Sequence, residues 1–270
     1  MPRKRPTIAD LRAIKGKRQL TMLRVMNLEE AEAAERAGID IVSIPPSLIL
    51  DPQYRDAAPS LFSMPGDNFF EIGTADDFVR WAFRMYKASA DAVYCSAGFA
   101  TVRRLAEDAI PVIGHVGLIP SRATWTGGFK AVGKTAEAAL QILAAVKQYE
   151  AAGAFGAEIE VVPVEVAEAI CRRTSLFLIS MGAGTGCDAQ YLFAEDILGQ
   201  NRAHMPRHSK VYRNFAAEYD RLQAERVAAF REFITDVGDG VYPEEKHIVR
   251  MEKAELAKFM EQVDRVALKS

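Results

Sequence analysis

Short apolar runs rich in β-branched residues alternate with helix-period segments from residue 20 onward, and this alternation constrains the fold more than any other feature. Strands separated by helices form a parallel sheet, because parallel neighbours need a crossover connection. Seven or eight such strands favour a closed (β/α)8 TIM barrel over an open sheet. Strands are predicted at residues 20–25, 40–44, 60–63, 90–96, 111–115, 157–162 and 176–181, with a weaker one near 203–204.

The segments between these strands carry ordinary helix signals. Residues 29–38 are rich in alanine and glutamate and end on Gly38, which predicts a helix with a glycine C-cap. Thr74 is a typical N-cap for the helix that follows it. The remaining predictions are helices at residues 78–88, 100–108, 135–152, 164–173 and 188–198, and a loop at 121–133.

Two long helices are predicted beyond the repeat, at residues 212–237 and 251–268. They could cover the barrel or pack on a partner subunit. No linker or composition break marks a second domain. The sequence therefore predicts one barrel domain over residues 1–270, in which residues 207–270 form a helical C-terminal extension.

The charge balance excludes several classes of partner. Thirty-four basic and 36 acidic residues leave a net charge of −2, which offers no field for gathering nucleic acid. No apolar stretch approaches the roughly 20 residues of a membrane span, and the basic residues 2–6 lack the apolar core of a signal peptide. Three cysteines without metal-ligand spacing indicate reduced thiols in a cytoplasmic protein.

Candidate functional residues stand at the predicted carboxyl ends of the strands, where the active site of such a barrel lies. Glu160 is the most informative, because a carboxylate at the barrel mouth is costly unless it is paired or used as a base. A glutamate satisfied by contacts at the rim is an equally good interpretation. The other candidates are Ser47, Ser96, His115 and the turn Gly182-Ala183-Gly184, with Asp67 in a loop.

The histidine and the glycine turn each have a plain alternative. His115 could polarise a carbonyl or carry a proton, but a histidine bonded within the core is ordinarily commoner. Gly182 and Gly184 could present backbone N–H groups to a carboxylate, or simply form a tight turn.

Several segments carry a resemblance to a known family: residues 111–120, 127–130, 160–167, 181–184, 188–190, 204–207 and 240–243. Together they resemble the ketopantoate hydroxymethyltransferase family, in whose order they occur between residue 111 and about residue 245. The resemblance implies a (β/α)8 barrel that assembles into large homo-oligomers.

The resemblance also implies a chemistry, that of the first committed step of pantothenate biosynthesis. In the family a divalent metal, usually Mg²⁺, holds a 2-oxo acid, and a glutamate removes the proton beside the carbonyl. The enolate then attacks the one-carbon unit of methylenetetrahydrofolate. By position Glu160 matches the base, His115 the substrate-contacting histidine, and Ser47 the serine after the second strand.

The chain departs from the family where the family binds its metal. Pro46 stands in place of a metal-binding aspartate, and Tyr94 and Ser96 replace a lysine and an acidic residue. Asp67 is the remaining candidate for a metal ligand. The resemblance therefore implies a weakened or absent Mg²⁺ site, with Ser47, Tyr94 and Ser96 as substitutes that hold the substrate's carboxylate.

Three functions remain open at this level. The first is a hydroxymethyltransferase-like enzyme acting on a 2-oxo acid. The second is a C–C lyase of the retro-aldol type, or a hydrolase, acting on a different 2-oxo or dicarboxylic acid, since one fold hosts many reactions. The third is a non-catalytic relative, against which the retention of both His115 and Glu160 argues.

Overall fold

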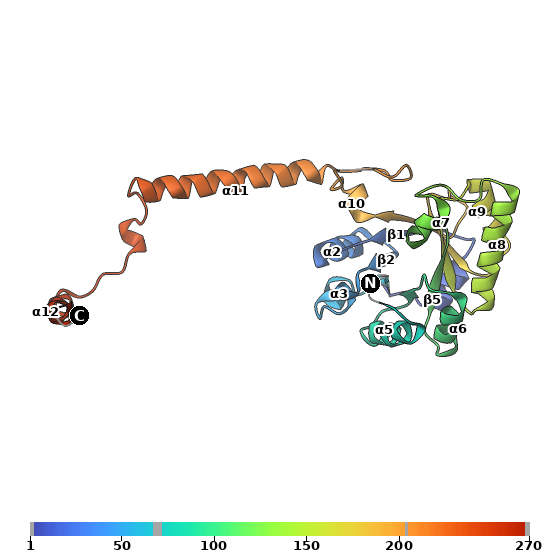
Figure 1. Cartoon of the computed structure of the whole chain (residues 1–270), viewed down its shortest axis with the longest axis horizontal. Coiled ribbons are helices and arrows are strands. Elements are labelled where there is room, and N and C mark those ends of the chain that lie inside the picture. Colours follow the sequence, from blue (N-terminus) through green and yellow to red (C-terminus); the bar gives the residue numbers. More distant parts are fainter. Residues whose placement is uncertain (1–2, 67–71, 203–204, 268–270) are drawn as a thin grey trace. The chain divides into compact units, whose positions relative to one another are not determined.

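The computed structural model describes residues 3–66, 72–202 and 205–267. The chain divides into two compact units, Met1–Phe215 and Ala216–Ser270. The first unit contains the parallel sheet and the helices around it, and the second consists of helical segments (Figure 1).

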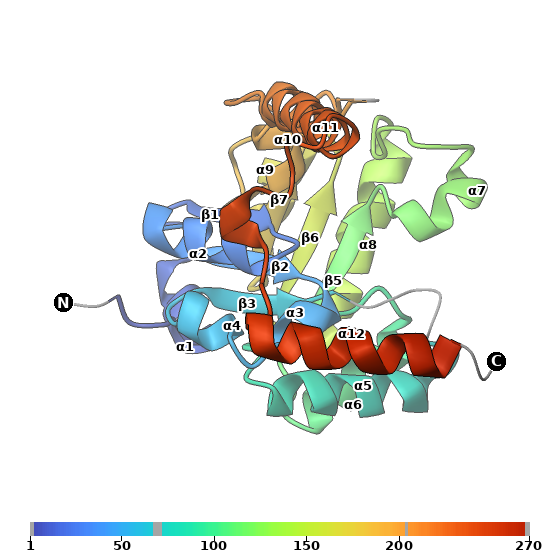
Figure 2. The same ribbon diagram turned by 90° about the vertical axis from the view of Figure 1, so that its left-hand side faces the viewer.

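Eight parallel strands follow one another in chain order around a near-closed barrel, which confirms the predicted fold class. Every strand pairs in parallel with its neighbour, and Figure 2 shows β5, β6 and β7 side by side. The closing seam, between β3 and β4, holds a single bridge, Gly66 to Tyr94. The strands are β1 (Leu20–Arg24), β2 (Ile41–Ile44), β3 (Phe62–Pro65), β4 (Val93–Tyr94), β5 (Val112–Gly117), β6 (Gly156–Glu160), β7 (Phe177–Met181) and β8 (Ala189–Phe193).

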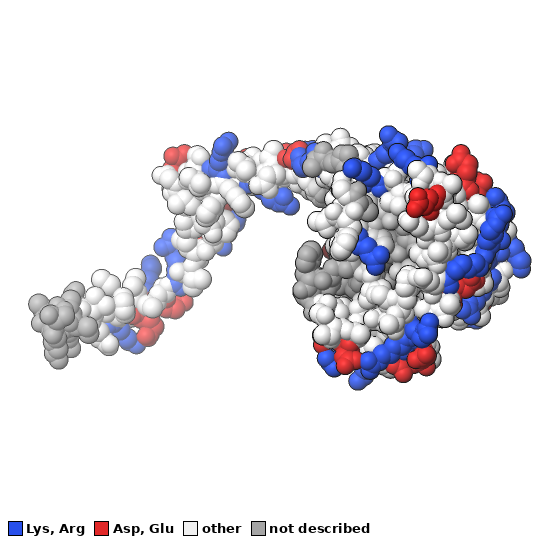
Figure 3. Space-filling view, turned by 45° about the vertical axis from the view of Figure 1, so that its right-hand side comes forward, with Lys and Arg blue, Asp and Glu red and all other residues white. Residues whose placement is uncertain are grey.

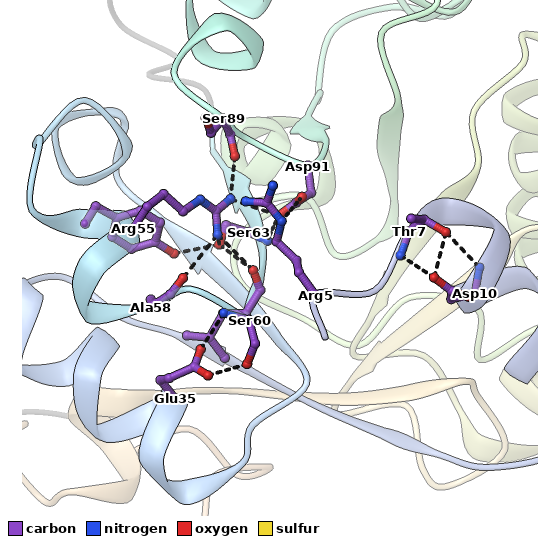
Figure 4. Close-up of polar contacts among 12 residues, drawn as sticks. Arg5, Thr7, Asp10, Glu35, Arg55, Ala58, Ser60, Ser63, Ser89 and Asp91 are labelled. Carbon is purple, nitrogen blue, oxygen red and sulfur yellow. Dashed lines mark hydrogen bonds and ion pairs between the residues drawn. The ribbon is translucent and has the colours of Figure 1, made fainter. Parts of the chain in front are cut away.

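Side chains reinforce the β3–β4 seam. The Asp91 N–H donates to the Ser63 carbonyl at 3.0 Å, and the Ser63 N–H donates to Asp91 Oδ2 at 2.8 Å. Arg55 and Arg5 both pair with the Asp91 carboxylate, at 2.9 and 3.3 Å (Figure 4). Burial raises the pKa of Asp91, although the two arginines oppose that shift. The seam is thus closed mainly by side chains.

The predicted helix ends match the structure closely. Asn27, Thr74 and Thr135 each accept a hydrogen bond from the backbone N–H three residues later, as N-caps do. Gly38 ends its helix with φ 84°, a conformation that favours glycine. The helices of the barrel unit are α1 (Ile8–Ile14), α2 (Leu28–Ala37), α3 (Pro46–Ile49), α4 (Tyr54–Ala57), α5 (Ala75–Lys87), α6 (Phe99–Glu107), α7 (Ala123–Thr126), α8 (Ala136–Ala151), α9 (Val164–Cys171) and α10 (Ala194–Ile197).

One predicted helix is wrong, and its correction locates the eighth strand. Residues 188–198 were expected to be helical, but they form β8 and the short α10. β8 pairs with β1 on one side and β7 on the other, so barrel closure decides its structure over local propensity. The weak strand expected near residues 203–204 lies outside the described residues.

Several short elements were not predicted from the sequence, among them α3 and α4. α1 precedes the barrel, and Thr7 and Asp10 form a capping box at its start. The predicted loop at residues 121–133 contains α7 and the 3₁₀ turn Pro120–Arg122.

Two buried clusters form the core. The larger lies between strands and helices, and the smaller fills the barrel. Leu11 of α1 belongs to the smaller cluster with Leu20 and Phe177, which start their strands. α1 therefore packs against the amino-terminal end of the barrel.

The second unit contains most of α11 (Phe215–Gly238), the 3₁₀ turn Glu245–His247 and α12 (Lys253–Ala267). These helices confirm the two predicted beyond the repeat. Among the described helices, none combines the length and apolarity needed to cross a membrane. On the face shown in Figure 3, basic and acidic side chains lie intermixed, as the small net charge suggests.

Candidate active site

A cavity of about 260 Å³ opens at the carboxyl ends of the strands. In barrels of this type the active site lies at this end. Every strand except β3 contributes at least one residue to the cavity wall, and the segment after β3 contributes Gly66. The lining residues are Arg24, Ser43, Gly66, Tyr94, His115, Pro120, Glu158, Glu160, Met181, Tyr191 and Phe193.

β6 supplies two carboxylates to this cavity. Side chains alternate along a strand, so Glu158 and Glu160 face the barrel interior while Ala157 and Ile159 pack towards the helices. The two glutamates are 3% and 8% exposed, which makes both nearly as buried as core residues. Pairing with β5 places His115 opposite Glu158. Neighbouring strands thus bring three ionisable groups together.

Glu160 and His115 form the closest of these contacts. His115 Nε2 lies 3.0 Å from Glu160 Oε2. The angle is outside hydrogen-bond geometry, so this buried nitrogen has no hydrogen-bond partner among the described residues. Burial lowers the pKa of His115, but the charges of Glu158 and Glu160 outweigh it, and the net pKa is raised. The imidazole is therefore positioned to bond a group that enters the cavity.

Glu158 is held by a tyrosine. The Tyr94 hydroxyl donates to Glu158 Oε2, and the Tyr94 ring meets the His115 ring edge-on at 5.8 Å. Burial raises the pKa of Glu158, while His115, Tyr94 and Arg24 oppose the shift. Burial and the charge of Glu158 raise the pKa of Tyr94 well above its usual value. Glu158 is therefore easier to protonate than an exposed glutamate, and Tyr94 keeps its proton.

Arg24 brings a permanent positive charge to the opposite side of the barrel, since β1 lies four strands from β5. Its NH1 donates to Ser43 Oγ at 2.8 Å and to the Ile44 carbonyl at 3.3 Å. Nearby, burial and the charge of Glu158 raise the pKa of Tyr191. A planar guanidinium held in this way matches the geometry of a carboxylate.

The structure brings together three of the residues predicted from sequence: Tyr94, His115 and Glu160. Ser47 is exposed on α3 and does not line this cavity. Ser96 lines a separate cavity beside Thr101. Asp67 lies outside the described residues.

The glycine turn after β7 is held by hydrogen bonds among its own residues and their neighbours. Gly182 and Gly184 have φ values of 65° and 82°, in the left-handed region. Ser180 Oγ accepts from the Ala183 N–H and donates to the Gly184 carbonyl, which also accepts from Gln190. These bonds are those of a self-contained turn.

Sequence reasoning missed Arg24, Glu158 and Tyr191. Glu158 could have been found, because it stands two residues before Glu160 and so shares its face. Arg24 also carried a signal, as a charged residue at the end of an apolar strand. Tyr191 was hidden by the wrong assignment of its segment as a helix.

The ligands expected for the family's magnesium do not fit the described residues. The Pro46 side chain has no ligand atom, and Ser96 lines another cavity. His115, Glu158 and Glu160 do offer ligand atoms within 4.8 Å of one another, and could hold a divalent metal. An imidazole with two carboxylates suits Mn²⁺, Fe²⁺ or Zn²⁺ better than Mg²⁺, which prefers an all-oxygen site.

Fold and site together define a (β/α)8-barrel enzyme with a carboxylate–histidine pocket at the barrel mouth. Residues 63–245 match the family described as ketopantoate hydroxymethyltransferase. The chain belongs to this family.

Curated relatives agree with this assignment. The chain is 31% identical over 264 residues to the 3-methyl-2-oxobutanoate hydroxymethyltransferase of Thermotoga neapolitana, covering 89% of this chain and 95% of that protein. It is 35% identical over 190 residues to the enzyme of the same name from Clostridium botulinum, covering 69% and 66%.

A solved structure supports the fold. Phosphoenolpyruvate phosphomutase from Streptomyces platensis is similar with a TM-score of 0.51 at 16% identity, covering 98% of this chain and 99% of that one. At this identity the likeness concerns the barrel alone.

Proposed function

We propose that this protein forms the enolate of a 2-oxo acid and transfers a one-carbon unit to it, as a hydroxymethyltransferase. The observation that carries the proposal is the buried contact between Glu160 and His115, 3.0 Å apart at the mouth of the barrel. Family membership supplies the reaction class. Proton removal beside a carbonyl needs a base and a hydrogen-bond donor, and Glu160 and the unpartnered Nε2 of His115 can supply them.

Glu160 acts as the general base. It takes a proton from the carbon beside the substrate's carbonyl, and the electrons of that C–H bond form the enolate. His115 Nε2 donates a hydrogen bond to the carbonyl oxygen, where negative charge develops. Water releases the one-carbon unit of methylenetetrahydrofolate as formaldehyde, and tetrahydrofolate leaves. The enolate carbon adds to the formaldehyde carbon, and the formaldehyde oxygen takes up a proton to become the hydroxyl of the product.

Arg24 holds the substrate's carboxylate. In the family a metal does this, but the described residues do not rebuild that site. Arg24 is partly buried, lines the cavity and faces the carboxylates of β6 across the barrel. An arginine there can accept a carboxylate in a bidentate way. It also keeps a 2-oxo acid oriented with its carbonyl towards His115.

A second candidate function is a retro-aldol C–C lyase acting on another 2-oxo or dicarboxylic acid. The observation that favours it is Glu158, a second carboxylate within reach of the first. Two carboxyl groups whose environments differ can divide acid and base roles. In this reaction Glu160 accepts the hydroxyl proton as the C–C bond breaks, and Glu158 returns a proton to the carbanion.

We also propose that the chain forms a homo-oligomer. Phe230, Phe233 and Ile234 on α11 are large apolar side chains, 54–68% exposed within the described chain. Exposed apolar groups gathered on one helix favour contact with another protein surface. Size-exclusion chromatography with light scattering tests this, and a monomer at micromolar concentration would refute it.

The deciding experiment is proton exchange of 3-methyl-2-oxobutanoate in deuterated buffer, followed by NMR. The proposal predicts exchange at the carbon beside the carbonyl without methylenetetrahydrofolate, and product formation when it is added. The experiment is repeated with a chelator and with added Mg²⁺ or Mn²⁺. Exchange that persists with the chelator supports binding of the substrate by Arg24 and His115 without a metal.

Absence of exchange in every condition would refute the hydroxymethyltransferase proposal for this substrate. The lyase is then tested by incubating 2-hydroxy and 2-oxo dicarboxylic acids and looking for released aldehyde or ketone.

A further inference from the structure

A second polar cavity, of about 350 Å³, opens at the amino-terminal end of the barrel. It is lined by the segment that joins α1 to β1 and by the segment that precedes β8. Two of the chain's three cysteines, Cys171 and Cys187, lie in its wall. Nothing in the proposed reaction uses them.

Asp188 organises this cavity. It is 3% exposed, and its carboxylate accepts from Lys15 Nζ at 2.8 Å, from the Leu178 N–H at 2.8 Å and from the Gly16 N–H at 3.2 Å. Lys15 Nζ also lies 3.6 Å from Cys171 Sγ, which is 3.8 Å from Asp188 Oδ2. The position of the lysine, and with it a positive charge beside one thiol, is therefore fixed.

The backbone before β8 runs tightly along α9 and brings the two cysteines together. A Cβ added to Gly184 would lie 2.3 Å from Val164, at the start of α9. One added to Gly186 would lie 2.1 Å from the side chain of Glu168, one turn further along. Cys187 comes next and lines the same cavity as Cys171, the last residue of α9.

The two thiols differ in character. The hydrogen bond between the two thiols is the main cause that lowers the pKa of Cys171, and Lys15 acts in the same direction. Burial and the Asp188 carboxylate oppose this shift, but the net pKa of Cys171 is lowered. The same bond, with burial, raises the pKa of Cys187. Cys171 is half-buried at the cavity wall, whereas Cys187 is buried. A thiolate beside a lysine is the reactive form of cysteine.

We propose that Cys171 and Cys187 form a peroxide-sensitive thiol pair, in which Cys171 is the reactive cysteine and Cys187 the resolving one. The Cys171 thiolate attacks a hydroperoxide, such as hydrogen peroxide: the O–O bond breaks, Cys171 becomes a sulfenic acid, and hydroxide leaves. The Cys187 thiol then displaces the sulfenic oxygen, which leaves as water when its proton is added. The two thiols are oxidised to one disulfide, and the peroxide is reduced to water.

The disulfide would join the end of α9 to the segment before β8. That segment begins at the glycine turn after β7 and leads to Tyr191 in the active-site cavity. Oxidation at the base of the barrel would thereby fix the connection between two strands that line its mouth.

The test uses the full-length protein, treated with increasing hydrogen peroxide and then alkylated under denaturing conditions. The proposal predicts loss of two alkylatable thiols, a Cys171–Cys187 peptide in a non-reducing digest, and full reversal by dithiothreitol. Cys95 is fully buried and provides an internal control that stays reduced. Without peroxide, Cys171 is expected to alkylate at least about tenfold faster than Cys187 in the native protein at neutral pH.

Two serine variants distinguish the roles. In Cys187→Ser, Cys171 should still react, but oxidation should proceed to sulfinic acid because no thiol resolves it. In Cys171→Ser, Cys187 should resist peroxide. The proposal is overturned if the wild-type protein forms no Cys171–Cys187 bond, or if Cys95 is oxidised as readily as Cys171.

Discussion

The two ends of the barrel treat buried charge in opposite ways. At the amino-terminal end, the Asp188 carboxylate accepts four hydrogen bonds, one of them from Lys15 and one from the Cys171 thiol. At the carboxyl end, Glu158 accepts one hydrogen bond, from the Tyr94 hydroxyl, and His115 Nε2 lies close to Glu160 without a hydrogen bond. A fully bonded buried charge is tolerated by a fold and becomes costly when a partner is removed, whereas an incompletely bonded one costs stability until a ligand completes it. The difference favours a structural role for Asp188 and a catalytic role for the pocket at the carboxyl ends of the strands.

The largest expected effect is at the mouth. Glu160→Gln keeps the shape of the side chain but removes the base, so turnover should fall by about 10²–10⁴-fold. The melting temperature should stay the same or rise, because the variant removes a buried charge. Both are measured on one preparation, by NMR exchange and by calorimetry. A variant that exchanges substrate protons at the wild-type rate would remove Glu160 from the mechanism.

The opposite behaviour is expected for Asp188, at the amino-terminal end of the barrel. Asp188→Ala leaves Lys15 and two backbone N–H groups without their acceptor, so the free energy of unfolding should fall by about 3 kcal/mol. Activity per folded molecule should persist, since Asp188 lies at the other end of the strands from the pocket. Urea unfolding monitored by circular dichroism gives the first quantity. Asp188→Asn is the matched control, because it removes the charge but retains an acceptor.

Arg24 tests whether the mouth holds an anion. Arg24→Met should lower kcat/KM for a 2-oxo acid by roughly 10- to 100-fold, the value of one or two charge-assisted hydrogen bonds. The loss should appear mainly in KM, because the carboxylate is bound equally in the ground and transition states. Arg24→Lys should recover part of it. An unchanged KM for Arg24→Met would mean that another group, or a metal, holds the carboxylate.

The sequence predicted the barrel far better than it predicted the pocket. Strands and caps depend on neighbouring residues, so Gly38, Thr74 and Thr135 were recognisable or fell at predicted helix boundaries. β8 was not recognisable, since pairing with β1 and β7 across the sequence defines it. The partnership of Tyr94 with Glu158 likewise joins residues 64 positions apart. Contacts between residues so far apart depend on the register in which the strands pair when the barrel closes, and no local sequence pattern predicts that register.

The smallest expected effect concerns a more exposed carboxylate at the base. Glu150, on α8, accepts from the Ser175 N–H and hydroxyl, both at 2.6 Å, just before β7 begins. Burial acts to raise its pKa, but Lys147 and Ser175 outweigh it and lower the pKa from 4.5 to about 2. Because the folded-state pKa is the lower one, Glu150 stabilises the protein above about pH 4.5, and this is lost as pH falls towards 2.

Glu150→Gln should therefore reduce the free energy of unfolding by about 1 kcal/mol at pH 7, a value kept small because the side chain is 25% exposed and screened by water. The difference from wild type should shrink as the pH falls below 4.5, as far as the protein stays folded. Unfolding curves of both proteins at several pH values measure it. If the difference in the free energy of unfolding did not depend on pH, Glu150 would act through packing. Hydrogen-bonded carboxylates at the amino-terminal end of the barrel would then stabilise the fold by their shape rather than their charge.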